Sequence, residues 1–593
     1  MSERDDRGGD VPGGAGARRR FLKGLALAGA GSAVFGRALL AAAEAKGKVT
    51  AEMVRQAEWV SGLTFTDEER SLMLEDLDGD AEGLARLRAL LLDNAVPPAL
   101  RFHPIGGGDS GGAAPPLAPG SFPAGPPPQR PASDADLAYA SLVDLARLVR
   151  SRALSPVELV RASVARIGRL DPKLLSVVSL TADRAAEAAR RAETEIAAGK
   201  WRGPLHGLPW GAKDLLAVPG APTTWGSPIF RAQDRRETAS VVARLDDAGA
   251  ALVAKTSVGE LAWGDVWYGG TTKNPWKLDQ GSSGSSAGSS AGVSAGFYPF
   301  AIGTETWGSI VSPATRCGVT GLRPTFGRVS RHGAMALSWS MDKVGVLARS
   351  AEDCAWVLAA IHGADPLDPT AVTRPFDWPP KRGLFDLRVG FVEALFDDPR
   401  ETPGAKPPTP EAKARRAEQL SFDRAVLDTL RRLGAKLVPV ELPEPSRVEP
   451  LSLILTAEAA AAFDDLVRSG RVKEMVRQTK DAWPNVFRQG QLVTAVDYLR
   501  ANRARTLLMR EMEGRLSGVD ALVAPTYGGA GLLLTNLTGH PAVALPNGFF
   551  ASDGTPASIT FTGRLFGESD LLVLAKAYQD ATDFHRKRPP LPA

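Results

Sequence analysis

From Leu137 to the C-terminus, short apolar segments alternate with long amphipathic segments, and few folds fit this pattern. Apolar residues recur every three or four positions in 139–167 and 183–199, which is typical of helices. The apolar segments between the helices, such as 249–257 and 542–548, have the length of buried strands. Short strands that alternate with helices predict an α/β domain with a mixed central sheet covered by helices on both faces.

Composition excludes several classes of protein. The chain has 593 residues, of which 44% are hydrophobic and 23% charged, as in ordinary globular proteins. Its net charge is +4, and the basic residues form no stripe that would indicate nucleic-acid binding. The two cysteines, Cys317 and Cys354, cannot make a disulfide framework and are predicted core residues. No histidine spacing indicates a metal site, so we expect neither metal nor cofactor.

The N-terminus resembles an export signal. Residues 18–36, RRRFLKGLALAGAGSAVFG, place paired arginines before Phe-Leu-Lys and a moderately apolar run, which is typical of the twin-arginine route. Ala43-Glu44-Ala45 fits a small-x-small cleavage site. A membrane anchor is the alternative, but Arg37 and the many Gly and Ala residues make the run too short and weakly apolar. We therefore predict a signal peptide over 1–45 and a periplasmic or extracellular protein.

Residues 46–100 are predicted to form a helical segment ahead of the main domain. Helical periodicity is present in AEMVRQAEWVSGL and in DAEGLARLRALLLDNA, and Thr66–Glu69 has the pattern of a capping box. The sequence DLDGD at 76–80 resembles half a calcium loop. Its glycine comes too early, however, and Leu87 stands where a glutamate is needed, so a polar turn between helices is favoured.

A Pro/Gly-rich stretch separates this segment from the α/β domain. Residues 104–131 contain no hydrophobic periodicity and cannot bury enough surface to order themselves. We therefore predict a linker over 101–136 and a main domain over 137–593, to which 46–100 is an N-terminal helical extension. The size and composition leave open whether the chain forms a homodimer.

A run of Gly, Ser and Ala at 281–296, GSSGSSAGSSAGVSAG, lies inside the α/β domain. A flexible linker would end at a domain boundary, but this run continues into the apolar segment GFYPFAIG and then the turn TETWGSI. Glycines let the backbone approach a ligand closely, and serines can supply hydroxyls at the same place. Taken alone, the run fits a linker, a packing element or an active-site loop.

Five segments follow one another along the chain. They are GPLHGLPWGAKDLLAVPGAPTTWGS (203–227), Asn274-Pro275-Trp276, SGSSAGSSAGVSAG (283–296), GTETWGSIVSPATRCGVTGLRPTFGRVSR (303–331) and NLTGHPAVALPNGF (536–549). Together they resemble the amidase signature family, in the family's order and over roughly residues 137–588. The resemblance implies the amidase signature fold, and hydrolysis of a carboxamide through an acyl-enzyme.

The resemblance implies a Ser–cis-Ser–Lys triad. Ser309 would be the nucleophile, Ser285 the bridging serine after a cis peptide bond, and Lys213 the base. A serine becomes a good nucleophile only when a base takes its proton, and a lysine can be that base only when burial or nearby dipoles lower its pKa. Lys213 lies between apolar runs, which is consistent with burial. The implied oxyanion hole consists of four backbone amides, those of Thr306, Trp307, Gly308 and Ser309.

The chain departs from the common family pattern at three positions. Trp307 replaces a glycine, and its ring either contacts the substrate or turns away and packs. Val311 replaces an arginine that can bind a carboxylate in family members, so a neutral substrate is favoured, with Trp307 and Val311 as predicted substrate contacts. Glu305 replaces the more usual aspartate. This combination resembles the peptide amidase branch.

These observations predict an exported serine amidase that acts on a neutral carboxamide, either a C-terminal peptide amide or an aryl amide. It would release ammonia or an amine, and its partners would be the substrate and the twin-arginine export machinery. One alternative is an amidotransferase A-type subunit, against which the export signal and Val311 argue. The other is a secreted binding protein that keeps the fold without catalysis.

Overall fold

The computed structural model describes residues 48–90, 92, 99–100, 122, 125–397 and 409–592. The predicted signal peptide and most of the predicted linker lie outside the described residues. The chain divides into two compact units, 1–83 and 84–593, and each is described by itself. Among the described residues, no helix has both the length and the apolar character needed to cross a bilayer.

The first unit contains α3 (Ala51–Ser61) and the greater part of α4 (Asp67–Ala89). Thr66 and Glu69 form the capping box at the start of α4, since each backbone N–H donates to the other residue's side chain. The turn predicted over 76–80 is wrong, because α4 runs through these residues without a break. Gly79 costs a helix only about 1 kcal/mol, which the surrounding helix-forming residues offset.

The last turn of α4 belongs to the second unit. Leu84 and Leu87 pack in a hydrophobic cluster with side chains of α18 (Ala495–Leu516). The guanidinium of Arg500, in α18, donates to the carbonyl oxygens of Leu87 at 2.9 Å and Arg88 at 2.8 Å. These carbonyls have no partner inside α4 because they lie at its C-terminal end. The arginine thus supplies donors that the helix itself lacks.

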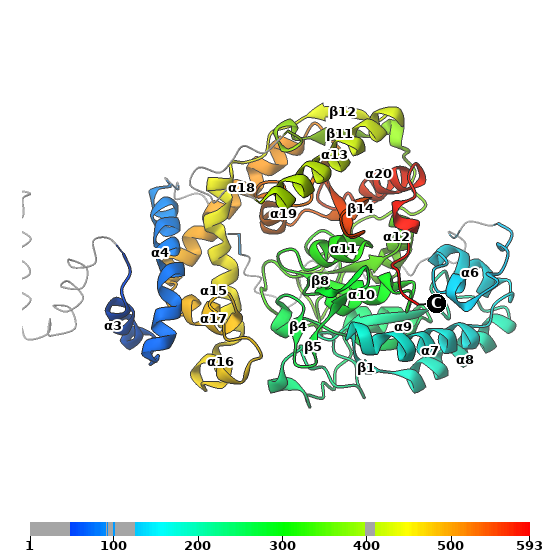
Figure 1. Cartoon of the computed structure of the whole chain (residues 1–593), viewed down its shortest axis with the longest axis horizontal. Coiled ribbons are helices and arrows are strands. Elements are labelled where there is room, and N and C mark those ends of the chain that lie inside the picture. Colours follow the sequence, from blue (N-terminus) through cyan, green and yellow to red (C-terminus); the bar gives the residue numbers. More distant parts are fainter. Residues whose placement is uncertain are drawn as a thin grey trace, which may run out of the picture. The chain divides into compact units, whose positions relative to one another are not determined.

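Within the described residues, eleven strands form one mixed sheet in the order β1-β3-β2-β8-β10-β9-β14-β15-β13-β11-β12. Figure 1 labels β1, β8, β14, β11 and β12 of this sheet. Strands β3, β2 and β8 are parallel, as are β13, β11 and β12, while the strands between these groups pair antiparallel. The strands are Val177–Leu180 (β1), Pro209–Lys213 (β2), Ala251–Thr256 (β3), Phe300–Glu305 (β8), Thr320–Arg323 (β9), Lys343–Ala348 (β10), Arg388–Phe391 (β11), Lys436–Pro439 (β12), Ala521–Pro525 (β13), Ala542–Phe549 (β14) and Pro556–Gly563 (β15).

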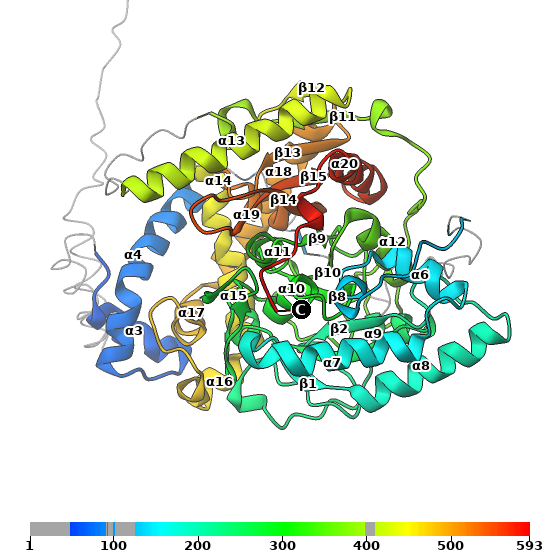
Figure 2. The same cartoon turned by 45° about the vertical axis from the view of Figure 1, so that its right-hand side comes forward.

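Helices cover both faces of the sheet, which confirms the predicted fold class (Figure 2). One face carries α7, α8, α10 and α11, whose apolar side chains share a core with the strands. The other face carries α9, α12 and α20. The bounds are Pro156–Leu174 (α7), Ala182–Ala197 (α8), Ser240–Asp247 (α9), Ala287–Ser294 (α10), Val311–Cys317 (α11), Ala351–Ile361 (α12) and Glu568–Asp580 (α20). Cys317 and Cys354 are fully buried in α11 and α12, as predicted.

A group of helices between β12 and β14 has its own hydrophobic cluster, to which Ile454, Leu508 and Leu534 contribute. Two short ribbons, β4–β5 and β6–β7, precede the Gly/Ser/Ala run. The remaining elements are Asp134–Leu137 (α5), Leu142–Arg150 (α6), Pro410–Arg432 (α13), Pro445–Val448 (α14), Leu453–Ala462 (α15), Asp464–Arg468 (α16), Trp483–Gly490 (α17), Gly531–Thr538 (α19), Val266–Trp267 (β4), Gly270–Thr271 (β5), Lys273–Asn274 (β6) and Lys277–Gly281 (β7).

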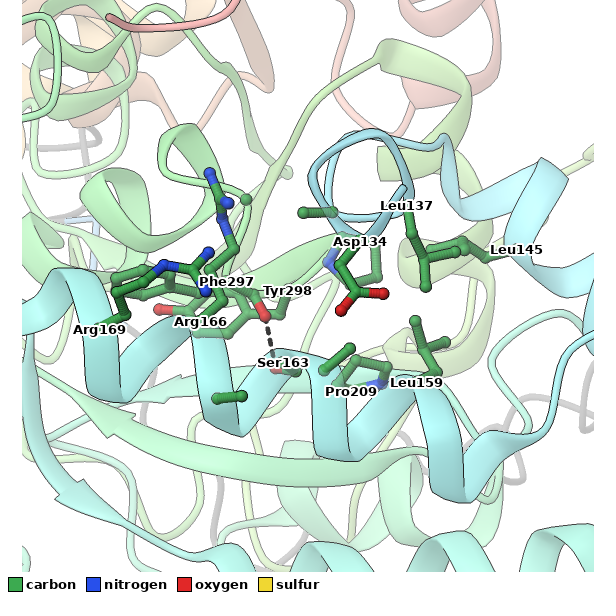
Figure 3. A pocket seen from close by; sticks show the side chains of 15 residues that line it. Asp134, Leu137, Leu145, Leu159, Ser163, Arg166, Arg169, Pro209, Phe297 and Tyr298 are labelled. Carbon is green, nitrogen blue, oxygen red and sulfur yellow. Dashed lines mark hydrogen bonds between the residues drawn. The ribbon is translucent and has the colours of Figure 1, made fainter. Parts of the chain in front are cut away.

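Helix α7 anchors the segment that follows α10. The Ser163 hydroxyl donates to the Phe297 carbonyl (Figure 3). Arg166 Nε donates to the Ala295 carbonyl at 2.8 Å. Asp134 and Pro209 lie at the same place, around a cavity of about 50 Å³. A cavity of this size has room for a few water molecules but not for an organic ligand.

The buried ion pair of Arg328 and Glu568 joins the segment after β9 to the start of α20. The Arg328 Nη2–Glu568 Oε2 distance is 2.6 Å, and both side chains are fully buried. We expect Glu568→Gln to lower the free energy of unfolding by about 3–5 kcal/mol, because it leaves a buried guanidinium without its counter-charge. Urea unfolding monitored by fluorescence measures this. Asp377→Asn, which breaks an exposed pair with Lys381, should change it by under about 0.5 kcal/mol. Equal effects of the two substitutions would contradict the prediction.

Candidate active site

Lys213 is the last residue of β2, and its side chain is completely buried. Its Nζ lies 2.8 Å from Ser285 Oγ and 3.0 Å from Ser286 Oγ. It also lies 2.8 Å from Thr304 Oγ1 and 3.2 Å from the Thr304 carbonyl oxygen. The amine is therefore surrounded by hydroxyls and a carbonyl, and no carboxylate of the described residues contacts it directly.

Burial lowers the pKa of Lys213 well below its usual value of 10.5. Removal from water disfavours the charged ammonium, and this effect outweighs the attraction of the more distant Asp342 and Glu305 carboxylates. A neutral amine has a lone pair that can accept a proton from a hydroxyl. The structure thus gives Lys213 the property that a lysine base requires.

The Gly/Ser/Ala run is neither a linker nor a simple packing element. The peptide bond between Gly284 and Ser285 is cis, and Ser283 has a φ of +59°. A Cβ on Gly284 would lie 1.8 Å from the carbonyl oxygen of Gly264, so only glycine fits there. Helix α10 begins two residues after Ser285. The run therefore folds tightly against neighbouring backbone and carries Ser285 to Lys213.

Ser309 lies in the turn between β8 and α11. Gly308, immediately before it, has a φ of +90°, a conformation that favours glycine. The backbone N–H of Ser286 donates to the Ser309 carbonyl at 3.1 Å. This bond holds the Ser309 turn against the residue that follows Ser285. The structure thus brings together, from three separate segments, the residues that the sequence predicts as a triad.

The predicted oxyanion hole lies in the same turn. Within the described part of the chain, no protein acceptor takes a hydrogen bond from the backbone N–H groups of 306–309. Amide hydrogens without a protein partner are available to bind a negatively charged oxygen. The assignment of the four predicted residues to the hole stays a prediction.

Glu305 fixes the backbone on the far side of Ser309. Its carboxylate accepts hydrogen bonds from the backbone N–H groups of Ile310 at 2.8 Å and Val311 at 2.9 Å. It also receives bonds from Arg323 Nη1 at 2.6 Å and Asn536 Nδ2 at 2.8 Å. Burial alone would raise the pKa of Glu305, but the charge of Arg323 and these hydrogen bonds lower it to about 2. The carboxylate therefore stays ionised and holds the first turn of α11.

Three residues of the site were missed in the sequence. The Ser286 hydroxyl contacts Lys213 and accepts a bond from the Thr304 N–H at 3.1 Å. Thr304 contributes both a hydroxyl and a carbonyl oxygen to the lysine. Asp342 accepts a bond from the Thr306 hydroxyl at 2.5 Å. Ser286 could have been predicted as a site residue because it directly follows Ser285. Nothing in the local sequence distinguishes Asp342.

The two predicted substrate contacts are placed differently. Trp307 is 45% exposed at the start of the turn, so its ring does not pack into the core. The Val311 side chain is fully buried in the core beside Ala314. This burial argues against direct contact between Val311 and a substrate, because the side chain faces other apolar residues. Val311 affects the site through its backbone N–H, which donates to Glu305.

The residue after Lys213 forms a further buried ion pair. Asp214 lies 2.7 Å from the Nζ of Lys255, in β3, and both side chains are fully buried. Asp214 also accepts a bond from the Thr224 N–H at 3.0 Å. These contacts hold the end of β2, and with it Lys213. Among the described residues, no three His, Cys, Asp or Glu side chains gather closely enough to bind a metal ion.

Comparison with known proteins places the chain in one family. The profile of the family described as Amidase matches residues 158–532. The A-type subunit of glutamyl-tRNA(Gln) amidotransferase from Anaeromyxobacter dehalogenans (strain 2CP-C) is 37% identical over 491 residues, which cover 75% of this chain and 95% of that protein.

Solved structures give the same result. The native peptide amidase of Stenotrophomonas maltophilia has a TM-score of 0.63 and 30% identity, over 76% of this chain and 98% of its own. A bacterial aryl acylamidase of the amidase signature family has a TM-score of 0.65 over 76% of this chain and 99% of its own. At 24% identity, that likeness shows the fold alone. With its matching profile, fold and site segments, the chain belongs to the amidase signature family of amide-hydrolysing enzymes.

Proposed function

We propose that this protein hydrolyses a neutral carboxamide through an acyl-enzyme on Ser309 and releases ammonia or an amine. The observation that carries the proposal is the buried amine of Lys213, 2.8 Å from the Ser285 hydroxyl. A desolvated lysine with a lowered pKa and a hydroxyl in reach has the features of a base that activates a nucleophile.

The proton follows a path through Ser285. As the Ser309 oxygen attacks the amide carbon, its proton passes to Ser285, and the Ser285 proton passes to Lys213. The backbone amides of 306–309 stabilise the negative oxygen of the tetrahedral intermediate. Lys213 returns its proton through Ser285 to the leaving amine, which departs and leaves an ester on Ser309. Water then attacks this ester by the same route and releases the carboxylic acid.

A neutral substrate agrees with the charges at the site. Val311 stands where family members can carry a carboxylate-binding arginine, and its side chain is buried in the core, so this position brings no cation to the site. The exposed ring of Trp307 offers an apolar surface at the start of the turn instead. Peptide amides or aryl amides are the substrates that we favour. The 30% identity with a peptide amidase supports the first of these.

An amidotransferase A-type subunit is the second candidate. The 37% identity with one such protein over 95% of its length favours it. It would require partner proteins and glutamine-dependent amidation of glutamyl-tRNA. Co-purification of such partners from the native host, together with this activity, would support the second candidate. Hydrolysis of amides by the purified chain alone would support the first.

The triad makes a direct prediction about activity. We expect Ser309→Ala and Lys213→Ala each to lower kcat by about 10⁴-fold or more, because they remove the nucleophile and its base. Ammonia release from C-terminally amidated dipeptides and amine release from anilides measure this. Lys381→Ala, on the exposed surface, is the control, and its kcat should equal that of the unmodified protein.

A fluorophosphonate probe checks the nucleophile independently of the substrate. It should label the unmodified protein and fail to label Ser309→Ala. Labelling without turnover of any amide would mean that the substrate panel is wrong. If neither labelling nor turnover is found in folded protein, the catalytically silent binding protein is the better description.

The lowered pKa of Lys213 predicts how activity depends on pH. Only the neutral amine can accept a proton, so kcat/KM should rise with pH through the lowered pKa and be lost as pH falls through it. The midpoint should lie clearly below 10.5. Lys213→Arg, which stays protonated at every usable pH, should be inactive throughout. A rising limb centred at or above 10.5 would show that Lys213 is not the titrating base.

We further propose that residues 1–45 direct export through the twin-arginine route, on the strength of the paired arginines and the apolar run. Arg18→Lys combined with Arg19→Lys should leave full-length precursor in the cytoplasmic fraction, because the receptor reads both arginines. Arg37→Lys, after the apolar run, is the matched control and should be exported. Immunoblots of cell fractions measure both. Equal export of the two variants would contradict the proposal.

A further inference from the structure

A cavity of about 320 Å³ is lined in part by a residue that contacts Lys213. Thr304 lines it, and the same residue places its Oγ1 2.8 Å from Lys213 Nζ. Asp342 lines it as well and accepts the hydroxyl hydrogen of Thr306, the first residue of the oxyanion turn. Two residues that line the cavity thus bind directly to groups of the active site. A ligand group in the cavity would lie beside the proton-transfer path.

One wall of the cavity is firmly held. Glu458, in α15, accepts hydrogen bonds from the Ser338 hydroxyl at 2.6 Å and from the Ser340 N–H at 3.0 Å. Between these serines, the carbonyl of Trp339 accepts a bond from Arg331 Nη1 at 2.6 Å. The backbone on both sides of Trp339 therefore has fixed partners, and the indole ring projects from a rigid segment.

Two large apolar side chains of the cavity are exposed to water. Trp339 is 51% exposed and Leu367 is 64% exposed. Leu367 also lies on an ordered turn, since its N–H donates to Asp365 Oδ1 at 2.9 Å. Met335 and Val344 add further apolar surface to the lining. Exposed apolar groups next to a cavity mark a ligand site, because leaving them in water is unfavourable.

Three of the four charged residues in the lining already have partners, and the fourth is Lys343. Asp342 accepts bonds from the N–H groups of Leu337 at 2.8 Å and Ser338 at 3.0 Å, besides that from Thr306. Arg331 pairs with Asp368 at 3.5 Å. Lys343 Nζ donates to the Met341 carbonyl, and burial lowers the pKa of Lys343 well below its usual value of 10.5, which favours the neutral amine. An ammonium or carboxylate entering the cavity would therefore lose its hydration without gaining a free counter-charge. A neutral apolar group would lose little favourable hydration on entering the cavity.

We propose that this cavity binds the ring-bearing side of the amide substrate, so that the enzyme favours neutral amides of aromatic acids with one or two fused rings. The inference rests on the proposed function, whose substrate class it narrows. An apolar cavity of about 150 Å³ is enough to bind benzene, and this cavity has roughly twice that volume. Trp339 would stack on the ring, and Thr304 would separate the ring from Lys213.

Kinetics with acetamide, benzamide and 2-naphthamide test the proposal. The unmodified enzyme should have its highest kcat/KM with 2-naphthamide. Trp339→Ala should lower kcat/KM for 2-naphthamide roughly tenfold or more, and leave acetamide within about twofold. Phe385→Ala, which also removes an exposed ring but outside the cavity lining, is the matched control and should change neither. If Trp339→Ala lowers kcat/KM equally for all three amides, or if the unmodified enzyme prefers acetamide, the proposal is overturned.

A second variant tests the space itself. Ala336 lines the cavity, and Ala336→Phe should fill part of it. The expected result is loss of activity on 2-naphthamide with acetamide retained. If the unmodified protein hydrolyses no amide, calorimetry of 2-naphthamide with the Ser309→Ala protein separates the two questions. If Ser309→Ala binds 2-naphthamide and the double variant with Trp339→Ala does not, the cavity assignment is supported even if the proposed function fails. If Ser309→Ala does not bind 2-naphthamide, the cavity assignment is overturned.

Discussion

The proposed chemistry of this protein depends on keeping one amine out of water. Lys213 ends a strand that is buried on both faces of the sheet, and hydroxyls and a carbonyl surround its Nζ. The same residue on an exposed surface would be an ordinary cation. Burial costs the folded state free energy if the amine is charged, so the protein favours the neutral form. The layers of helix over β2 and the Gly/Ser/Ala run are what exclude water.

A second electrostatic interaction joins segments that lie far apart in the sequence, and each segment needs the others to be stable. Glu305 ends β8, Arg323 ends β9, and Asn536 lies in α19, yet all three meet in one buried network beside the Ser309 turn. A buried carboxylate is stable only if donors and a counter-charge surround it. Loss of Arg323 would leave the Glu305 charge unmatched. The turn that carries Ser309 is therefore fixed by residues that lie far apart in the chain.

Much of this could be predicted from the sequence, because periodicity and the family segments report on local structure. The α/β class could be predicted in this way, and so could the segments that bring Lys213, Ser285 and Ser309 together. The errors have physical reasons. The acidic stretch at 76–80 looked like a turn, but it continues a helix whose other residues favour that conformation. The part played by Asp342 and Glu458 depends on contacts across the fold, which no local pattern encodes.

The contact between Arg500 and the end of α4 has a consequence for where the catalytic part of the chain begins. Composition places that start after the Pro/Gly-rich stretch, near residue 137. Packing places it earlier, because Leu84 and Leu87 fill the core of the helices between β12 and β14. A protein shortened to begin at residue 100 would leave a hole in that core and leave the Arg500 guanidinium without the two carbonyl oxygens to which it donates. The segment that looks like an appendage in the sequence is, at its last turn, an integral part of the enzyme's own interior.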